Sequence, residues 1–295
     1  MLGEVLKVLR EAGVEAEAFE TGAPGSAMAM AGRAAREGYD TIVACGGDGT
    51  VHEIVQSLVG TEIALGVFPL GTANALASDL GLTGKPARVA RALLDAKPTR
   101  VSVGRIHYQD SAGDPSSRYF VVAAGVGADA LLMSRLDARL KRRLGYILYL
   151  LEAVRIWATD PLPLFQAAVT ANGHDSARVT EVSQLLAVRV RSFGGVLRRL
   201  APGASLRNGT LNLLAFATRS RLSYLKFLLA VIAGRQTFSR EIELLEASSV
   251  ECHACNGAAD TIFVEADGEV LGSLPVRLEV VPHALTLLVP PGVQP

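Results

Sequence analysis

Three glycines, an aspartate and a threonine directly follow an apolar segment, in IVACGGDGTVHEIV at residues 42–55. The apolar part predicts a buried strand over 39–45, and the residues behind the glycines predict a helix over 50–59. The first N–H groups of a helix have no partner within it, and the helix dipole makes this end positive. Glycines let a bulky anion approach, because no Cβ obstructs it. The turn therefore predicts a phosphate-binding site, formed by Gly46, Gly47, Asp48, Gly49 and Thr50.

A second turn of the same kind lies one strand later, in GVFPLGTAN at residues 66–74. It provides Gly71, Thr72 and Asn74 after a predicted strand over 63–69. Adjacent parallel strands end at one edge of a sheet, where open α/β sheets bind ligands, so we expect both turns to face one crevice. Phosphates would repel Asp48 unless a cation lay between them. Asp48 therefore predicts Mg²⁺ beside the phosphates.

A third candidate is the carboxylate of Asp267, in FVEADGEV at residues 263–270. Asp-Gly between two strand-like segments first of all predicts a hairpin turn. Phosphoryl transfer, however, requires a carboxylate that orients the acceptor hydroxyl and takes its proton. A rigid turn that faces the glycine turns could supply this carboxylate, and domain closure would then exclude water.

Three other patterns predict less chemistry. The residues Gly125, Gly127 and Ala130 fit G-x-G-x-x-A, but they lie outside any βαβ unit, so a dinucleotide site is disfavoured. Cys252 and Cys255 form a single C-x-x-C, which alternation along a strand explains better than zinc binding. The five histidines are scattered, and we assign none a role, including His52 behind the first turn.

The elements that would position the glycine turns alternate between helix and strand. Leu2, Val5, Leu6 and Leu9 share one helical face, and strands are expected near 14–20, 39–45 and 63–69. Thr50 and Glu53 fit a capping box that would fix the start of the helix over 50–59. Strands separated by helices predict parallel pairing with right-handed crossovers. Residues 1–98 are therefore expected to form an α/β nucleotide-binding domain.

From about residue 99 the chain changes to short valine-rich segments, separated by turn-rich pieces such as DSAGDPSS. Strand after strand without crossover helices predicts an antiparallel β-sandwich, which we place at residues 99–283. Two helices are expected to interrupt it, over 140–157 and 220–233, with Ser220 as the cap of the second. The segment 284–295 could return to the first domain. The site is expected in a cleft between the domains.

Composition excludes several classes of function. The 29 basic and 29 acidic residues balance, so no net charge attracts nucleic acid. No uncharged apolar segment reaches the roughly 18 residues of a spanning helix, and the N-terminus lacks the pattern of a signal peptide. Three cysteines are too few for a disulfide framework. The chain of 295 residues is therefore expected to be cytoplasmic.

Five segments, in order along the chain, resemble the diacylglycerol kinase catalytic-domain family. They are GGDGTVHEIV, PLGTANALASDLGL, AAGVGADA, LAPGASLRNGTLNL and FVEADGEV. The chain looks in particular like the soluble bacterial lipid kinases, which are related to sphingosine and ceramide kinases. The likeness runs from about residue 2 to residue 290. NAD kinases and phosphofructokinases share GGDGT in related form, so the resemblance implies a first domain of their type.

The resemblance implies ATP as the phosphoryl donor, Mg²⁺, and a lipid hydroxyl, by default that of diacylglycerol, as the acceptor. The first glycine turn would hold the ATP phosphates, and Gly71, Thr72 and Asn74 would complete the nucleotide site. Asp267 matches the family's proposed catalytic aspartate, with Glu269 beside it. In sphingosine kinases the aspartate of the glycine turn, here Asp48, is the proposed base instead. Both assignments stay open.

Two departures from the family pattern carry expectations. The family usually opens with a strand and an N-P-x-[SG]-G loop near the nucleotide, whereas this sequence begins inside the following helix. We expect a misassigned start or a fragment, because loss of the strand would uncover an apolar sheet edge; a protein that binds ATP less completely is the alternative. In LRNG at 206–209, Asn208 stands where many relatives have an aspartate that helps to hold a structural Mg²⁺. Asparagine brings no charge, so this second metal is doubtful.

A lipid acceptor must be reached at a membrane, so peripheral membrane contact is expected. Lys141, Arg142 and Arg143 precede an apolar helix that ends near Trp157, which suits an anionic lipid surface, although a core helix explains the pattern equally well. Two further arginines, Arg198 and Arg199, could meet a headgroup or phosphates, or lie in a solvated loop. A homodimer stays open as the assembly.

Three alternatives to a diacylglycerol kinase remain. PLGTANALA is close to the wording of sphingosine kinases, so a sphingoid base or ceramide could be the acceptor. An NAD-kinase-like enzyme with a soluble acceptor would act without lipid, and the apolar second domain argues against it. A lipid- or nucleotide-binding protein without catalysis would bind these molecules but transfer no phosphate.

Overall fold

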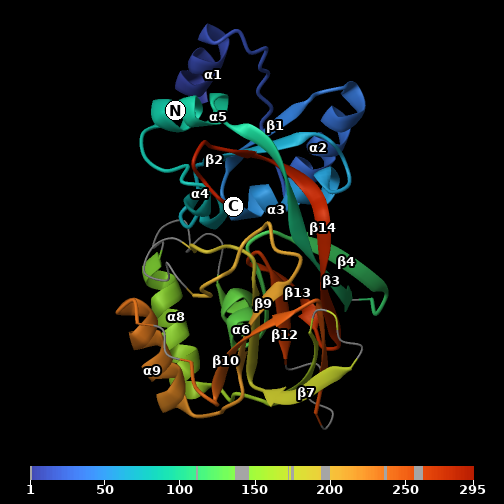
Figure 1. Ribbon diagram of the computed structural model, residues 1–295, viewed down its shortest axis with the longest axis vertical. Coiled ribbons are helices and arrows are strands. Elements are labelled where there is room, and N and C mark those ends of the chain that lie inside the picture. Colours follow the sequence, from blue (N-terminus) through green and yellow to red (C-terminus); the bar gives the residue numbers. More distant parts are fainter. Residues whose placement is uncertain are drawn as a thin grey trace.

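The protein has two domains, as the computed structural model in Figure 1 shows. The structure describes residues 2–110, 112–136, 146–171, 173, 176–193, 200–235, 238–255 and 262–295. The basic residues to which the sequence pointed as lipid or phosphate contacts lie outside the described residues; they are Lys141, Arg142, Arg143, Arg198 and Arg199.

The first domain alternates helices and strands, as predicted. Its elements are α1 (Leu2–Glu11), α2 (Ser26–Glu37), β1 (Thr41–Gly46), α3 (Asp48–Leu58), β2 (Ala64–Pro69), α4 (Ala75–Asp79) and α5 (Pro86–Leu94). Strands β1 and β2 pair in parallel from Thr41 opposite Ala64 to Gly46 opposite Pro69. Helix α1 packs against α5, and α2 packs against α3. The parallel α/β arrangement is confirmed, and it ends β1 and β2 at the same edge of the sheet.

The strand expected near 14–20 is wrong. Residues 14–22 form no regular secondary structure, and Phe19 is 52% exposed. Apolar and polar residues alternate there as they would in a strand, but alternation needs a neighbouring strand to pair with. In the described part of the chain β1 is the last strand of its sheet, with β2 as its one neighbour. The segment lies beside α2 instead, where the Arg33 guanidinium stands 5.7 Å from the centre of the Phe19 ring.

Two long strands run through both domains. They are β3 (Lys97–Gln109) and β14 (Val276–Val289), and they pair antiparallel from Lys97 opposite Val289 to His107 opposite Arg277. The register shifts between Val281 and Leu285. Beyond this irregularity, Thr286 and Leu287 of β14 pair in parallel with β2, which makes the first sheet mixed. Figure 1 shows the two strands crossing from one domain to the other.

The second domain is an antiparallel β-sandwich, as predicted. One sheet has the order β10-β9-β8-β5-β12-β13, and the other continues from β14 through β11 and β6 to β7. The strands are β4 (Pro115–Phe120), β5 (Ala123–Gly127), β6 (Phe165–Thr170), β7 (Ala177–Val182), β8 (Gln184–Val188), β9 (Leu211–Phe216), β10 (Ile242–Ala247), β11 (Ser249–Ala254), β12 (Phe263–Ala266) and β13 (Glu269–Ser273). Fully buried residues of both sheets, such as Phe165 and Leu213, form one core.

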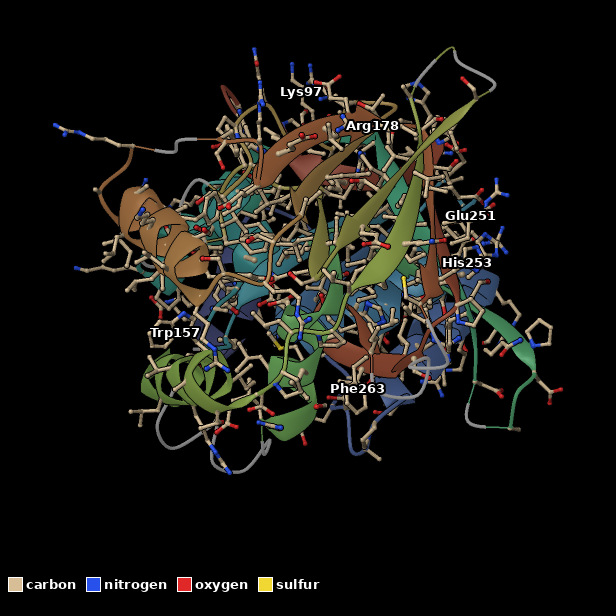
Figure 2. All side chains as sticks on the ribbon, turned by 90° about the horizontal axis from the view of Figure 1, so that it is seen from below. Lys97, Trp157, Arg178, Glu251, His253 and Phe263 are labelled. Carbon is tan, nitrogen blue, oxygen red and sulfur yellow. The ribbon has the colours of Figure 1, made fainter. Side chains whose placement is uncertain are left out.

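In the described part of the chain, the sandwich is accompanied by the helices α6 (Ala128–Arg135), α8 (Tyr146–Thr159) and α9 (Arg221–Ile232). The predicted cap of α9 is confirmed, because the Ser220 hydroxyl accepts from the N–H of Ser223 at 3.3 Å. Helices α8 and α9 lie side by side, since the indole N–H of Trp157 donates to the Arg221 carbonyl at 2.8 Å. Figure 2 shows Trp157 on this flank of the domain. No described helix has the length and apolar character needed to cross a membrane.

A buried guanidinium joins the long strand β3 to the sandwich. Arg189, just after β8, is 0% exposed. Its Nη2 donates to the carbonyls of Ser102 on β3 at 3.1 Å and of Asn208 at 3.0 Å, and its Nη1 donates to the carbonyl of Thr210. No described carboxylate forms an ion pair with it. Burial lowers the pKa of Arg189 to about 10, so it remains charged at neutral pH. Its two terminal nitrogens donate to carbonyls, while Nε is buried without a hydrogen-bond partner among the described residues.

Replacing Arg189 with methionine should therefore destabilise the fold. The change leaves three carbonyls without their donor, and burial of an unsatisfied polar group costs about 1–3 kcal/mol each. The free energy of unfolding, measured with urea, should fall by roughly 3 kcal/mol or more. The control is Arg178→Met, because Arg178 has a 62% exposed side chain in an ion pair with Glu243. That pair should contribute under about 1 kcal/mol. Equal losses in both variants would contradict a structural role for Arg189.

Candidate active site

The first glycine turn connects β1 to α3. A Cβ on Gly46 would lie 2.4 Å from Oγ1 of Thr50, so only glycine leaves room for the threonine side chain. Gly47 precedes the first residue of α3 in extended conformation, which starts the helix at Asp48. The turn therefore places the first N–H groups of α3 at the carboxyl edge of the sheet, where the sequence predicted them.

The capping box predicted for Thr50 and Glu53 is wrong. Helix α3 begins at Asp48, so Glu53 lies too deep in the helix to reach its start. The Glu53 carboxylate accepts instead from the N–H groups of Gly25 at 2.8 Å and Ala27 at 2.9 Å, at the beginning of α2. Glu53 is thus a cap for a different helix, and it holds α2 against α3.

The second glycine turn connects β2 to α4 and touches the first. A Cβ on Gly71 would lie 2.6 Å from Cα of Gly47, so the two backbones meet at a distance that only glycine permits. Asn74 has a left-handed φ of 48° and closes the turn with two hydrogen bonds: its Oδ1 accepts from the Gly71 N–H at 2.9 Å, and its Nδ2 donates to the Gly71 carbonyl at 2.6 Å. Thr72 lies exposed between them. Both turns therefore form one surface.

Asp48 links the two turns. Its Oδ1 accepts from the Ala75 N–H at the start of α4, at 2.8 Å. Burial, and to a lesser degree the negative charge of Asp267, raises the pKa of Asp48, while N–H groups of α4 act in the opposite direction. The carboxylate is thus partly engaged by the protein itself.

Asp267 lies in the hairpin turn between β12 and β13, and both residues of the turn, Asp267 and Gly268, have positive φ (49° and 87°). The predicted two-residue hairpin is confirmed by the pairing of Ala266 with Glu269. The Asp267 carboxylate is 1% exposed. It accepts from three consecutive backbone N–H groups, those of Val121 at 3.0 Å, Val122 at 2.8 Å and Ala123 at 3.1 Å.

A residue of α3 completes the surroundings of Asp267. His52 is 2% exposed, and its Nδ1 lies 3.3 Å from Oδ2 of Asp267. Its Nε2 lies 3.9 Å from Oε2 of Glu269, whose side chain is 47% exposed. Burial lowers the pKa of His52, but the hydrogen bond and the charge of Asp267 raise it more, so the net shift is upward. His52 thus connects the helix behind the first glycine turn to the hairpin of Asp267 and Glu269, which we call the acidic hairpin.

Two further carboxylates lie behind Asp267. A Cβ on Gly125 would come within 2.7 Å of Oδ2 of Asp129 and 2.8 Å of Oε1 of Glu265, so both carboxylates converge over this glycine. Oε2 of Glu265 accepts from the Gly268 N–H at 2.7 Å. Burial, and next the charge of Asp129, raises the pKa of Glu265 well above its ordinary value, and burial also raises the pKa of Asp129. A pair that shares one proton satisfies these conditions.

The described residues do not form a metal site of their own. No cluster of three or more histidine, cysteine, aspartate or glutamate side chains that could hold an ion occurs among them. At the position of the doubtful structural metal, the Asn208 side chain donates to the Gly203 carbonyl at 3.1 Å. The Asn208 carbonyl already accepts from Arg189. The backbone carbonyl of Asn208 is therefore engaged by a side-chain cation.

The site brings together residues that the sequence named and residues that it missed. Gly46, Gly47, Gly49, Thr50, Gly71, Thr72 and Asn74 lie in the two touching turns, and a Cβ on Gly49 would lie 3.7 Å from Glu269 of the second domain. The sequence interpretation missed His52, Asp129 and Glu265. A glutamate inside the apolar strand β12 was the available signal for Glu265. Gly125 and Gly127 make room for the two carboxylates and for the Ser183 carbonyl rather than for a dinucleotide.

Comparisons with known proteins agree on one family. The model of the diacylglycerol kinase catalytic domain matches residues 1–106, and that of the YegS C-terminal NAD kinase beta sandwich-like domain matches residues 120–289. A diacylglycerol kinase of Mycobacterium tuberculosis is 30% identical over 96% of this chain and 87% of its own length. A probable lipid kinase YegS-like of Chromohalobacter salexigens is 31% identical over 98% and 88%. The crystal structure of a putative diacylglycerol kinase from Bacillus anthracis has the same fold, with a TM-score of 0.76, 21% identity, and coverage of 99% and 90%.

The carboxylate pair predicts a particular dependence of stability on pH. Because folding raises the pKa of Glu265, the folded chain binds more protons than the unfolded chain between the ordinary and the raised pKa. The free energy of unfolding should therefore fall as the pH rises through this range. Glu265→Gln imitates the protonated acid, since its amide can donate to Asp129 and accept from Gly268. This variant should lose that slope in urea unfolding between acidic and alkaline pH. Glu246→Gln, on an exposed position of β10, should keep it; parallel curves for all three proteins would contradict the shared proton.

Proposed function

The chain belongs to the diacylglycerol kinase catalytic-domain family, and on this premise we propose that it transfers the γ-phosphate of ATP to a lipid hydroxyl. Membership in this family of kinases makes ATP the expected donor. The names of the relatives favour diacylglycerol as the acceptor. Magnesium would arrive with the nucleotide, bound to its phosphates, as part of the substrate.

One observation carries the proposal. The two glycine turns touch at Gly47 and Gly71, and the acidic hairpin of the second domain stands against them, with Glu269 beside Gly49. The N–H groups at the start of α3 and the positive end of its dipole suit the phosphates. Asp48 already accepts from the start of α4, so the phosphates would lie on the α3 side of this surface. An acceptor hydroxyl between the phosphates and the hairpin would complete the arrangement.

Each residue of the site then has a separate role in the transfer of the γ-phosphate. The acceptor oxygen attacks the γ-phosphorus, the bond from this phosphorus to the β-phosphate oxygen breaks, and ADP leaves. The hydroxyl proton passes to a carboxylate, for which we propose Asp267, because it matches the family's proposed catalytic aspartate and lies on the hairpin that stands against the glycine turns. Glu269, whose side chain is half exposed, would orient the hydroxyl. Domain contact at Gly49 would keep water away from the phosphates.

The flank formed by α8 and α9 supports a lipid acceptor. Leu222, Leu229 and Ile232 are 50–57% exposed on α9, and Leu151 and Val154 are 52–60% exposed on α8; we call these five residues the helical apolar surface. On α9 the exposed Lys226 lies in the same stripe, and the helix contains no acidic residue. Apolar side chains with a positive charge among them suit the surface of an anionic bilayer. We propose that this surface brings the enzyme to its lipid.

The kinase proposal is tested with purified protein, Mg²⁺, radiolabelled ATP and mixed micelles that contain diacylglycerol, ceramide or sphingosine, with NAD as a soluble acceptor. Label should enter one lipid. Asp267→Asn should lower kcat by roughly 10²–10⁴-fold, the usual effect of a lost proton acceptor. Glu269→Gln should also lower it without loss of stability, since this side chain is half exposed.

The control for these variants is Asp114→Asn, on an exposed turn, which should transfer phosphate like the wild type. Label in NAD alone would replace the lipid acceptor with a soluble one. Binding of ATP or lipid without any transfer would overturn the kinase proposal in favour of a binding protein without catalysis.

Membrane contact is tested by sedimentation with vesicles of phosphatidylglycerol and of phosphatidylcholine. The wild type should bind the anionic vesicles more strongly. Leu229→Asp places a charge in the helical apolar surface and should reduce this binding several-fold. Val179→Asp is the matched control, because Val179 is 60% exposed on β7, away from α8 and α9. Equal effects of both changes would show that the lipid meets another surface.

A further inference from the structure

His52 is a buried titratable group that the proposed reaction does not use. It is 2% exposed, and it lies on α3, one turn behind the first glycine turn. Its Nδ1 lies 3.3 Å from Oδ2 of Asp267, and its Nε2 is buried with no hydrogen-bond partner among the residues that the structure describes. A buried nitrogen without a partner is costly and needs an explanation. Oε2 of Glu269 lies 3.9 Å from Nε2.

Charged groups face His52 from the hairpin between β12 and β13, from β4 and from its own helix α3. Asp267 and Glu269 on the hairpin raise the pKa of His52, and Arg118 on β4 lowers it. On its own helix, Glu53 is engaged by α2 and Asp48 by α4. The imidazole therefore lies between helix α3, which follows the first glycine turn, and the two carboxylates of the hairpin.

The two protonation states would hold the hairpin differently. In the neutral form with hydrogen on Nδ1, the ring donates to Asp267 and turns a lone pair toward Glu269. In the protonated form both nitrogens donate, so the ring holds Asp267 and also attracts Glu269. A positive imidazole also makes Asp267 a weaker proton acceptor. The neutral form is thus the one that suits proton transfer.

We propose that His52 is a positioning residue of the kinase site. It aligns the Asp267–Glu269 hairpin with the first glycine turn, and this alignment depends on the protonation state of His52. The proposal rests on the proposed function, since the hairpin is taken to serve the acceptor hydroxyl. His52 acts through Asp267, and the three backbone N–H groups at 121–123 provide the remaining contacts of that carboxylate.

As a consequence, the rate of phosphate transfer should depend on the ionisation of His52. As the pH rises through the pKa of His52, which lies above the ordinary histidine value, kcat should increase. His52→Leu removes the hydrogen bond and should lower kcat by roughly tenfold to a hundredfold, as misplacement of a catalytic group does. The KM for ATP should change little, because His52 faces the hairpin rather than the phosphates.

His52→Asn is the discriminating variant. Its amide nitrogen can stand where Nδ1 stands and donate to Asp267, but it does not titrate. It should recover most of the kcat that His52→Leu loses, and it should lose the histidine limb of the pH profile. If His52→Asn is as impaired as His52→Leu, Nε2 itself takes part in the chemistry and the positioning role is overturned. If all three proteins share one pH profile, the role is overturned as well.

A second measurement keeps this inference separate from the kinase proposal. Amide hydrogen exchange at Val121 reports whether the hairpin carboxylate is held in place, whatever the protein phosphorylates. Protection should fall in His52→Leu and largely return in His52→Asn. In the wild type, the NMR titration of the His52 ring should show a raised pKa, which drops in Asp267→Asn. Unchanged protection in every variant would overturn the role of His52 even if the enzyme proves an active lipid kinase.

Discussion

The site depends on the hydrogen bonds that the buried carboxylate of Asp267 accepts. A carboxylate that is 1% exposed must be supplied with hydrogen-bond donors, and here they come from two other segments: the backbone at 121–123 and His52 of α3. Because each segment would leave a buried group unsatisfied if it moved alone, the hairpin, the sandwich and the first domain are held in one geometry. The acidic hairpin owes its place beside the glycine turns to these contacts.

The same geometry depends on the two long strands. Strands β3 and β14 belong to both domains, and Arg189 fixes β3 to the turn at 208–210. A hinge between the domains would have to bend the pair of strands β3 and β14. Their pairing is interrupted between Val281 and Leu285, where the register shifts. The first glycine turn and the acidic hairpin are therefore kept close by continuous backbone and not by side chains alone.

Much of the fold and the outline of the site follow from local patterns. Four predictions depend on neighbours in sequence and are confirmed: the strand expected over 39–45 and found at Thr41–Gly46, the helix after it, the hairpin at Asp267 and the cap at Ser220. The strand near 14–20 fails because pairing is a long-range property. The role of Glu53 fails because α2, far away in sequence, offers its N–H groups. His52 and Asp129 gain their partners only when distant segments meet, so no spacing in the sequence reveals them. The signal for Glu265 was its place inside an apolar strand.

The parallel pairing of β14 with β2 has a consequence for how the chain folds during synthesis. Residues 286 and 287 add a strand to the sheet of the first domain, beside residues 64 and 65. More than two hundred residues are translated between these partners. The first domain therefore has an unpaired, apolar edge at β2 until β14 has been synthesised, an edge of the kind that chaperones recognise. Closure of so long a loop makes this pairing a late step of folding.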